Sequence, residues 1–247
     1  MAGHSKWANI KHRKRAEDAK RAKIFTKMIR EVTVAARMGA PDPETNPRLR
    51  LAVDRALAVN MPKDNIDRAI KRAAGQDEHA QYEEPRFEGY GPSGAAVMVD
   101  TMTDNRNRTV SDIRHAFNKH GGKLGTDGSV AFLFSHRGVI TFAPETDEDT
   151  VMEHALEAGA EDVVNLDDGA IEVLTLPDTF IGVRDSLVAA GLEPAEAEVT
   201  MHPATTVALS GDHGTHMLRL IERLEDLDDV QRVYHNADLS EDVYAEA

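Results

Sequence analysis

The 247-residue sequence contains no cysteine. Disulfides, thiolate nucleophiles and cysteine-ligated metal sites are therefore excluded. Aromatic residues make up only 5% of the chain, so its cores must be built mainly from aliphatic side chains. No apolar run approaches the roughly 20 residues that a membrane span needs, and the charged N-terminus lacks the apolar stretch of a signal peptide. We therefore expect a cytoplasmic protein that binds no membrane.

Residue sets typical of catalysis are scarce as well. The sequence has no HExxH motif and no phosphate-loop spacing. His213 and His216 stand three residues apart near a predicted helix start, but no carboxylate lies at a recognised ligand spacing. Ser5, between His4 and His12, has no evident oxyanion hole. We predict a protein that is not an enzyme and that takes no metal, cofactor or small-molecule substrate.

Charge is distributed unevenly along the chain. The net charge is −14. Residues 1–75 hold 18 Lys and Arg against 8 Asp and Glu, whereas residues 76–247 hold 11 against 35. This asymmetry predicts a polyanionic partner for the basic part. The acidic part is repelled by the same partner, which restricts contact to one end of the molecule.

Residues 1–75 have the pattern of a small all-helical domain. Apolar residues recur at helical spacing between 16 and 38, and Gly39 ends that helix. A second helix is predicted from Pro47 to Val59. A third begins at Pro62, a favourable first helical residue, and ends at Gly75. The first 15 residues show no clear apolar period, and we interpret them as an arm.

The arm and the first helix concentrate the positive charge, with ten Lys and Arg against two acids in residues 1–30. Clustered cations bind phosphates without demanding a base sequence, and the indole of Trp7 is able to stack on a base or ribose. The helix cations fall opposite its apolar side, so we expect them to face solvent. A solvated basic tail with Trp7 packed on the protein is the alternative. The predicted nucleic-acid contacts are Lys6, Trp7, Lys11, His12, Arg13, Lys14, Arg15, Lys20, Lys23, Lys27 and Arg30.

The rest of the chain mixes strands and helices. After a turn marked by glycines between Gly89 and Gly94, a βαβ unit is predicted at 95–134, with its second strand at 130–134. Six elements in the β-α-β-β-α-β order of ferredoxin-like folds follow at 137–203, and the first is a strand at 139–142. A helix and strand within 214–234 then have no partner nearby in sequence, so we expect them to complete the first unit. The predicted fold class is α+β: an N-terminal all-helical domain, then two ferredoxin-like α+β domains, one inserted in the other.

The same order predicts the domain boundaries. Residues 1–75 form the basic helical domain, and the discontinuous middle domain takes residues 76–136 plus 204–238. The inserted domain spans 137–203, and residues 239–247 form an acidic tail. We expect the chain from Asn236 onward to fray.

Two further segments bear on ligand binding. Residues 103–109 join a strand end to a helix start, where free N–H groups favour phosphate, and Arg106 and Arg108 are able to add bidentate contacts. Ordinary helix capping is the alternative, by Asp104, Asn105, Asn107 or Thr109. The glycine-rich segment 119–128 is predicted to be a helix C-cap followed by a turn, with a mobile loop that contacts RNA or another ligand as the alternative.

These same residues resemble the YebC/PmpR family. The resemblance rests on MAGHSKWANIKHRK at the start, on NPRLRLAVDRALAVNMPKDNIDRAIKR at 46–72 and on the run between FEGYGPSGAAVMVDTMTDNRNRT and VAFLF at 87–134. It covers nearly the whole chain and is most specific over the first 134 residues. It implies three domains with the helical one first, and no catalytic activity or cofactor. The family carries the label of DNA-binding transcriptional regulators, while its mitochondrial members resemble translational activators and its bacterial members resemble ribosome-associated factors for proline-rich nascent chains.

Three functions therefore stay open at this point. The first is a non-enzymatic translation factor that contacts rRNA on the ribosome through the basic N-terminal domain. This interpretation is favoured because the cations suit backbone contact more than base reading, and because no reading helix stands out. The second is a DNA-binding transcriptional regulator. The third is a protein-interaction scaffold whose α+β domains bind protein. The sequence leaves the oligomeric state unknown.

Overall fold

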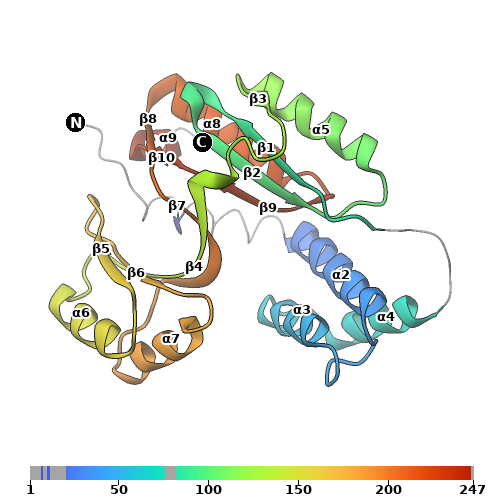
Figure 1. The fold of residues 1–247 in the computed structure, drawn as a ribbon, viewed down its shortest axis with the longest axis horizontal. Coiled ribbons are helices and arrows are strands. Elements are labelled where there is room, and N and C mark those ends of the chain that lie inside the picture. The colour runs from blue at the N-terminus through green and yellow to red at the C-terminus, as the bar shows by residue number, and fades with distance from the viewer. Residues whose placement is uncertain (1–6, 8–9, 12–20, 76–81, 246–247) are drawn as a thin grey trace.

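The computed structural model describes Trp7, residues 10–11, residues 21–75 and residues 82–245. Figure 1 shows three parts. A helical domain in blue and cyan and an αβ unit in yellow and orange lie at opposite sides below a central αβ unit in green and red. The central part is built from two stretches of chain, and the yellow and orange part lies between them in sequence. The fold is α+β.

Three helices form the N-terminal domain: α2 (Arg21–Met38), α3 (Pro47–Ala58) and α4 (Lys63–Ala74). Their apolar stripes meet in a common core that includes Val32, Leu49 and Ile66. The buried side chain of Asn46 fixes the α2–α3 turn. It accepts a hydrogen bond from the N–H of Leu49 and donates one to the carbonyl of Ala35, so it joins the start of α3 to α2.

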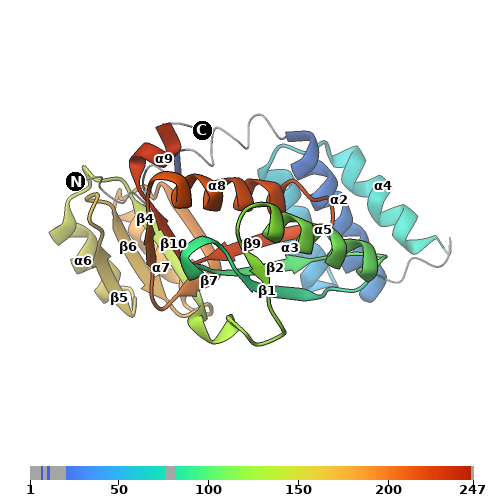
Figure 2. The same cartoon turned by 90° about the horizontal axis from the view of Figure 1, so that it is seen from above.

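The middle domain is a four-stranded sheet covered on one face by two helices. Its sheet has the order β3-β1-β2-β9, and α5 and α8 pack over it (Figures 1 and 2). β9 pairs antiparallel with β2, so the late strand joins the early unit as the order of elements predicts. The elements are β1 (Arg86–Tyr90), β2 (Ala96–Thr101), α5 (Arg106–Lys119), β3 (Lys123–Leu124), α8 (Gly211–Glu225) and β9 (Val230–His235).

Two local predictions for this domain are wrong. Residues 130–134, predicted as a strand, contain the 3-10 helix η2 (Ala131–Leu133), and the strand that pairs beside β1 is the short β3. The glycines around Gly89 suggested only a turn, but Gly89 lies inside β1. The turn itself is the 3-10 helix η1 (Pro92–Gly94). A Cβ atom on Gly89 would lie 2.7 Å from the carbonyl oxygen of Lys123, so glycine is needed here for close packing.

The glycine-rich segment after α5 is a helix cap and turn, as predicted. His120 is the C-cap residue, Gly121 adopts a φ of 78°, and the N–H of Gly122 donates to the carbonyl of Phe117 at 2.8 Å. Positive φ is a conformation that glycine adopts without steric cost, which explains its place after the helix. This bond returns the chain toward β3.

A buried carboxylate holds the loop that follows β3. Glu88 is 6% exposed, and its two oxygens accept hydrogen bonds from the N–H groups of Gly128, Val130 and Ala131 at 2.7–2.8 Å. Burial alone would raise the pKa of Glu88, but these three donors outweigh it, and the pKa lies below its ordinary value. Glu88 is therefore ionised at neutral pH and fixes the loop before the inserted domain.

We expect Glu88→Gln to lower the free energy of unfolding by about 2 kcal/mol, because an amide nitrogen cannot accept from a backbone N–H. Since the folded-state pKa is depressed, this stabilisation is present above the pKa of an unfolded Glu, about 4.3, and is lost as pH falls through the lower folded value. Urea unfolding at neutral and acidic pH measures the loss of unfolding free energy and its dependence on pH. Glu83→Gln, an exposed change near by, is the control, and equal losses for the two variants would contradict the assignment.

The inserted part is a complete β-α-β-β-α-β unit. Its sheet has the order β5-β6-β4-β7, which is the ferredoxin-like arrangement, and α6 and α7 cover one face. β4 starts earlier than the predicted strand at 139–142. The elements are β4 (Phe134–Phe142), α6 (Glu148–Glu157), β5 (Asp162–Asn165), β6 (Ile171–Thr175), α7 (Phe180–Ala189) and β7 (Glu196–Pro203).

A two-stranded ribbon joins the inserted part to the middle domain. β4 and β7 pair antiparallel from Phe134↔Pro203 to Thr141↔Glu196, so the chain enters and leaves side by side. The base of the ribbon packs on the sheet face away from the helices, where Ala96 and Met98 of β2 meet Phe134. Val97 and Val99, one residue out of phase, face the helices instead. β2 is therefore buried on both faces, which explains its continuous apolar run.

The end of the chain is folded through residue 245, so the expected fraying is wrong for this stretch. β10 (Ala237–Leu239) pairs parallel with β8 (Val207–Leu209), and α9 (Glu241–Ala245) follows. Leu239 and Val243 are 3% and 1% exposed and belong to the core of the middle domain. Acidic composition suggested a free tail, but burial of these two apolar side chains anchors it.

Candidate nucleic-acid interface

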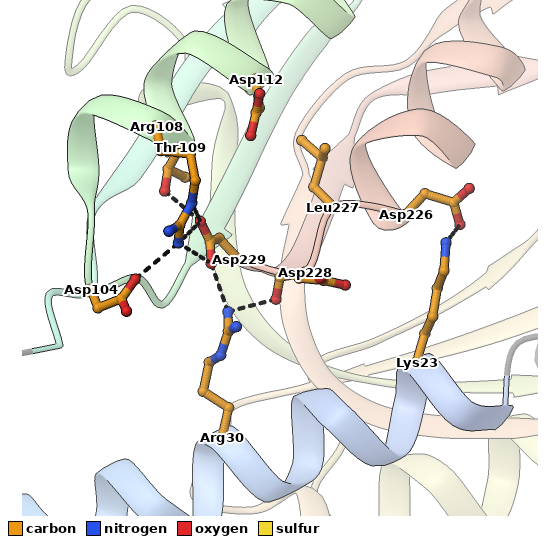
Figure 3. Close-up of a pocket in the computed structure, with 10 residues that line it drawn as sticks. All are labelled: Lys23, Arg30, Asp104, Arg108, Thr109, Asp112, Asp226, Leu227, Asp228 and Asp229. Atoms are coloured by element: carbon orange, nitrogen blue, oxygen red, sulfur yellow. Dashed lines mark hydrogen bonds and ion pairs between the residues drawn. The ribbon is translucent and has the colours of Figure 1, made fainter. Parts of the chain in front are cut away.

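A cleft lies where the helical domain meets the middle domain. It has a volume of about 590 Å³. Figure 3 shows α2 below the cleft, with the start of α5 and the segment between α8 and β9 above it. The cleft is lined by Lys23, Arg30, Asp104, Arg108, Thr109, Asp112, Asp226, Leu227, Asp228 and Asp229.

Asp229 joins the two domains in this cleft. It is 7% exposed, and its carboxylate accepts hydrogen bonds from Arg30 Nη1 at 2.9 Å, Arg108 Nη2 at 2.9 Å and Thr109 Oγ1 at 2.8 Å (Figure 3). Its backbone carbonyl accepts from the N–H of Met102. One acidic residue before β9 therefore binds α2, the start of α5 and the end of β2.

The electrostatics of Asp229 follow from these partners. Burial alone would raise the pKa of its carboxyl. Hydrogen bonds from Arg108 and Thr109, together with the positive charges of Arg108 and Arg30, outweigh burial, and the pKa lies below its ordinary value. The same contacts raise the pKa of Arg108. Asp229 is thus a charged structural partner at neutral pH and holds no proton to transfer.

Lys27 and Arg30 of α2 bind the middle domain, so the expectation that the helix cations face solvent is wrong for these two. Besides Asp229, Arg30 donates to the carbonyls of Asp228 and Met102, and its side chain is 18% exposed. Lys27 donates to the carbonyl of Glu225 at 2.7 Å. Helical periodicity shows which face lies away from a helix's own core, but not which other domain covers that face.

Lys23 differs from its two neighbours on α2. Its ammonium lies 3.0 Å from Asp226, yet its side chain remains 44% exposed. Exposed pairs of this kind contribute little stability, and a phosphate is able to compete for such a lysine. Whether Lys23, Lys27 or Arg30 contacts nucleic acid stays a prediction.

The loop between β2 and α5 separates its two arginines. Asn105, not Asp104, is the N-cap: its side chain accepts from the N–H of Arg108, while Asp104 forms an ion pair with the Arg108 guanidinium at 2.9 Å. Of the residues considered as possible caps, Asn105 takes this role and Asp104 does not. The Arg106 side chain is 55% exposed and lies 3.8 Å from Glu83. Arg108 is committed to Asp229, whereas Arg106 remains accessible to a ligand.

We expect Arg108→Ala to lower the free energy of unfolding by about 1–2 kcal/mol, because Asp229 loses a charged donor. This loss of unfolding free energy is small for such a network because the Arg108 side chain is half exposed. Arg106→Ala should change stability by no more than about 0.5 kcal/mol. Chemical denaturation of the two single variants measures the difference. Equal destabilisation would show that the Arg108–Asp229 contact contributes nothing.

The described part of the arm packs on the protein. The backbone N–H of Trp7 donates to a carboxylate oxygen of Asp168 at 2.7 Å, and Ile10 is 3% exposed. The ammonium of Lys11 lies 5.2 Å from the centre of the Trp7 ring. Trp7 is therefore partly covered, and its contact with nucleic acid stays a prediction. The other predicted contacts of this segment lie outside the described residues: Lys6, His12, Arg13, Lys14, Arg15 and Lys20.

Asp229 was not predicted as a site residue from the sequence. A signal was present, since four acids occur within the five residues from Glu225 to Asp229, directly after a helix. This run complements the cationic face of α2 in charge, but 199 positions separate Arg30 from Asp229, so the sequence alone does not pair them. Within residues 21–75 and 82–245, no three His, Asp or Glu side chains form a possible metal site, and no helix is long and apolar enough to cross a membrane.

Fold and junction together define an α+β protein with a basic helical domain fixed by ion pairs to a middle domain that carries an inserted ferredoxin-like unit. The chain belongs to the TACO1/YebC family. Residues 5–76 match the family's N-terminal domain, and residues 82–237 match its second and third domains.

Relatives match this chain over nearly its full length. A protein of Halorhodospira halophila is 67% identical over all of both chains, and one of Hahella chejuensis is 62% identical over 98% of each. Each is named a probable transcriptional regulatory protein. The crystal structure of a conserved hypothetical protein from Aquifex aeolicus is 45% identical. It matches with a TM-score of 0.73 over 90% of this chain and 92% of that one.

Proposed function

We propose that this protein is a non-enzymatic regulator of gene expression that binds RNA on the ribosome. It contacts rRNA from the side of its basic helical domain and aids the synthesis of difficult, proline-rich nascent chains. The distribution of charge in the fold carries the proposal. Residues 1–75 have a net charge of +10, whereas the inserted residues 137–203 hold 2 Arg and 16 Asp and Glu. These two parts lie at opposite sides of the molecule (Figure 1).

Such a molecule is oriented by a polyanion. The basic side is attracted and the acidic side repelled, so one end enters a site walled by phosphates while the other remains outside it. The translational part of the proposal rests on the family resemblance, with ribosome-bound RNA as the polyanion.

The helical domain supports backbone contact over base reading. Two of the cations on α2 are held by the middle domain, and α4 carries both signs of charge on its exposed face. A helix that reads bases needs side chains free to enter a groove, whereas backbone contacts require only accessible cations. The exposed charged residues of α4 are Lys63, Asp64, Asp67, Arg68, Lys71 and Arg72.

The chemistry of the cleft supports a non-enzymatic function. Its buried carboxylate, Asp229, is ionised and fully engaged by two arginines and a threonine. A general acid or base needs a pKa near the working pH, and the pKa of Asp229 is shifted the other way. The cleft thus contributes to domain docking and not to a reaction.

A DNA-binding transcriptional regulator is the second candidate, favoured by the names of the relatives. Ultraviolet crosslinking in cells, followed by sequencing of the bound nucleic acid, separates the two. Recovery of rRNA fragments supports the ribosomal function, and recovery of promoter DNA supports the transcriptional one. Ribosome profiling of a strain without the protein provides the second readout, because pauses at proline runs should rise only in the first case.

A further inference from the structure

The basic residues of helix α8 lie along one side of the helix. His216, Arg219 and Arg223 are spaced i, i+3 and i+7, so they lie along one side of the helix. Glu225 falls on another side, and Glu222, three residues after Arg219, borders the row of cations. The C-terminal end of α8 meets α2, where the carbonyl of Glu225 and the carboxylate of Asp226 bind lysines. The exposed Arg219 and Arg223 lie away from this contact.

The cations of α8 face the end of α5. The two helices pack side by side on one face of the middle sheet, through Ile113, Phe117 and Met217 among others (Figure 2). The pKa of His120, at the end of α5, shows that the cations of α8 lie near this residue. Burial lowers the pKa of His120, and the positive charges of Lys119, His216, Arg219 and Arg223 lower it further. Like charges from two elements therefore gather here.

These cations have no acidic partner within the described chain. Lys119, Arg219 and Arg223 are exposed and form no ion pair there. Several arginines elsewhere in the described chain do have a neighbouring acid, as Arg86 has Asp100 and Arg184 has Asp185. In a chain of net charge −14, a cluster of unmatched cations favours an anionic ligand from outside.

We propose that the α5/α8 surface, formed by Lys119, His120, His216, Arg219 and Arg223, is a second contact site for the phosphate backbone of nucleic acid. This site extends the proposed function to the middle domain and rests on it. His216 and Arg223 are separated by about 10 Å along the helix. One strand of a duplex carries roughly three phosphates over that length. The cation spacing therefore fits a strand. The opposing charges of Asp112 and of four other aspartates lie in the cleft that faces α2.

The test uses the full chain with Arg219→Gln and Arg223→Gln together. Binding to a fluorescent RNA hairpin is measured by anisotropy over a range of salt concentrations. Loss of two phosphate contacts should weaken binding about tenfold or more and flatten the slope of log K against log salt by about 1.4–1.8. Arg137→Gln with Arg184→Gln, which removes the same charge from the inserted domain, should leave affinity and slope nearly unchanged.

Two further variants keep the outcome clear. Arg219→Lys with Arg223→Lys preserves the charge and should restore most of the slope, and equal melting temperatures show that all variants fold. If the wild-type protein binds neither the RNA hairpin nor a DNA duplex, the proposed function itself fails. If it binds but the double Gln variant keeps the wild-type slope, only the α5/α8 site is refuted. A variant that loses affinity for polyglutamate but not for RNA would assign the surface to an acidic protein and also refute it.

Discussion

Replacing Asp229 by Asn is expected to lower the free energy of unfolding by about 2–3 kcal/mol, because two arginines lose the charged acceptor that they share in a largely buried site. The helical domain should also dock less firmly, so amide exchange in α2 should rise. Chemical denaturation and hydrogen exchange measure the two effects. Asp228→Asn is the matched control, since Asp228 contributes its backbone carbonyl and not its exposed side chain.

The effect of Asp229 depends on pH in a defined direction. Its folded-state pKa is depressed, so its stabilisation is present above the pKa of an unfolded Asp, about 3.9, and is lost as pH falls through the lower folded value. The stability difference between wild type and Asp229→Asn should therefore be constant near neutrality and shrink in strong acid. A difference that persists unchanged in acid would show that the carboxylate charge is not its source.

Replacing Lys6, Lys11, Arg13, Lys14 and Arg15 by Gln is expected to weaken nucleic-acid binding by about 100-fold or more at moderate salt. The slope of log K against log salt should flatten by as much as about 3.5–4.5, if each cation neutralises one phosphate. Trp7 and Ile10 are left in place, so the packing of this segment is retained. Salt-dependent anisotropy with an RNA hairpin measures both quantities.

The control for this variant exchanges Lys and Arg at the same five positions. Charge is preserved, so the slope should stay close to that of the wild type, since backbone attraction depends mainly on charge. An unchanged slope after replacement by Gln would mean that the arm is merely solvated. A slope that falls in the charge-preserving control as well would point to damage to the fold.

Periodicity predicted most of the elements because each buries a face in its own domain. The helices of the N-terminal domain and the late pairing of Val230–His235 with β2 both follow from apolar spacing and element order. β1 was not predicted because a glycine such as Gly89 favours a turn when only its neighbours in sequence are considered. The need for glycine there comes from Phe117 and Lys123, which pack against it from later in the chain.

The candidate site was predicted only in its residue types. Lys27, Arg30 and Arg108 stood out as cations, but their partners lie on a segment about 120 to 200 positions away. The residues around a cation do not show which distant segment it contacts in the folded protein. For the same reason the α5/α8 surface escaped notice, because Lys119 and Arg219 are neighbours only once both helices pack on the sheet.

The paired ribbon of β4 and β7 has an evolutionary consequence. Ser135 and His202 are opposite one another across the pair, so the two ends of the inserted unit nearly coincide in space. A genetic event that added or removed everything between them would need only a short turn to rejoin the chain. The core between the sheet and helices α5 and α8 would keep its packing, since Val97 and Val99 bury their side chains on that face of the sheet. The unit is therefore modular, able to diverge or be exchanged while the parts that dock on α2 stay fixed.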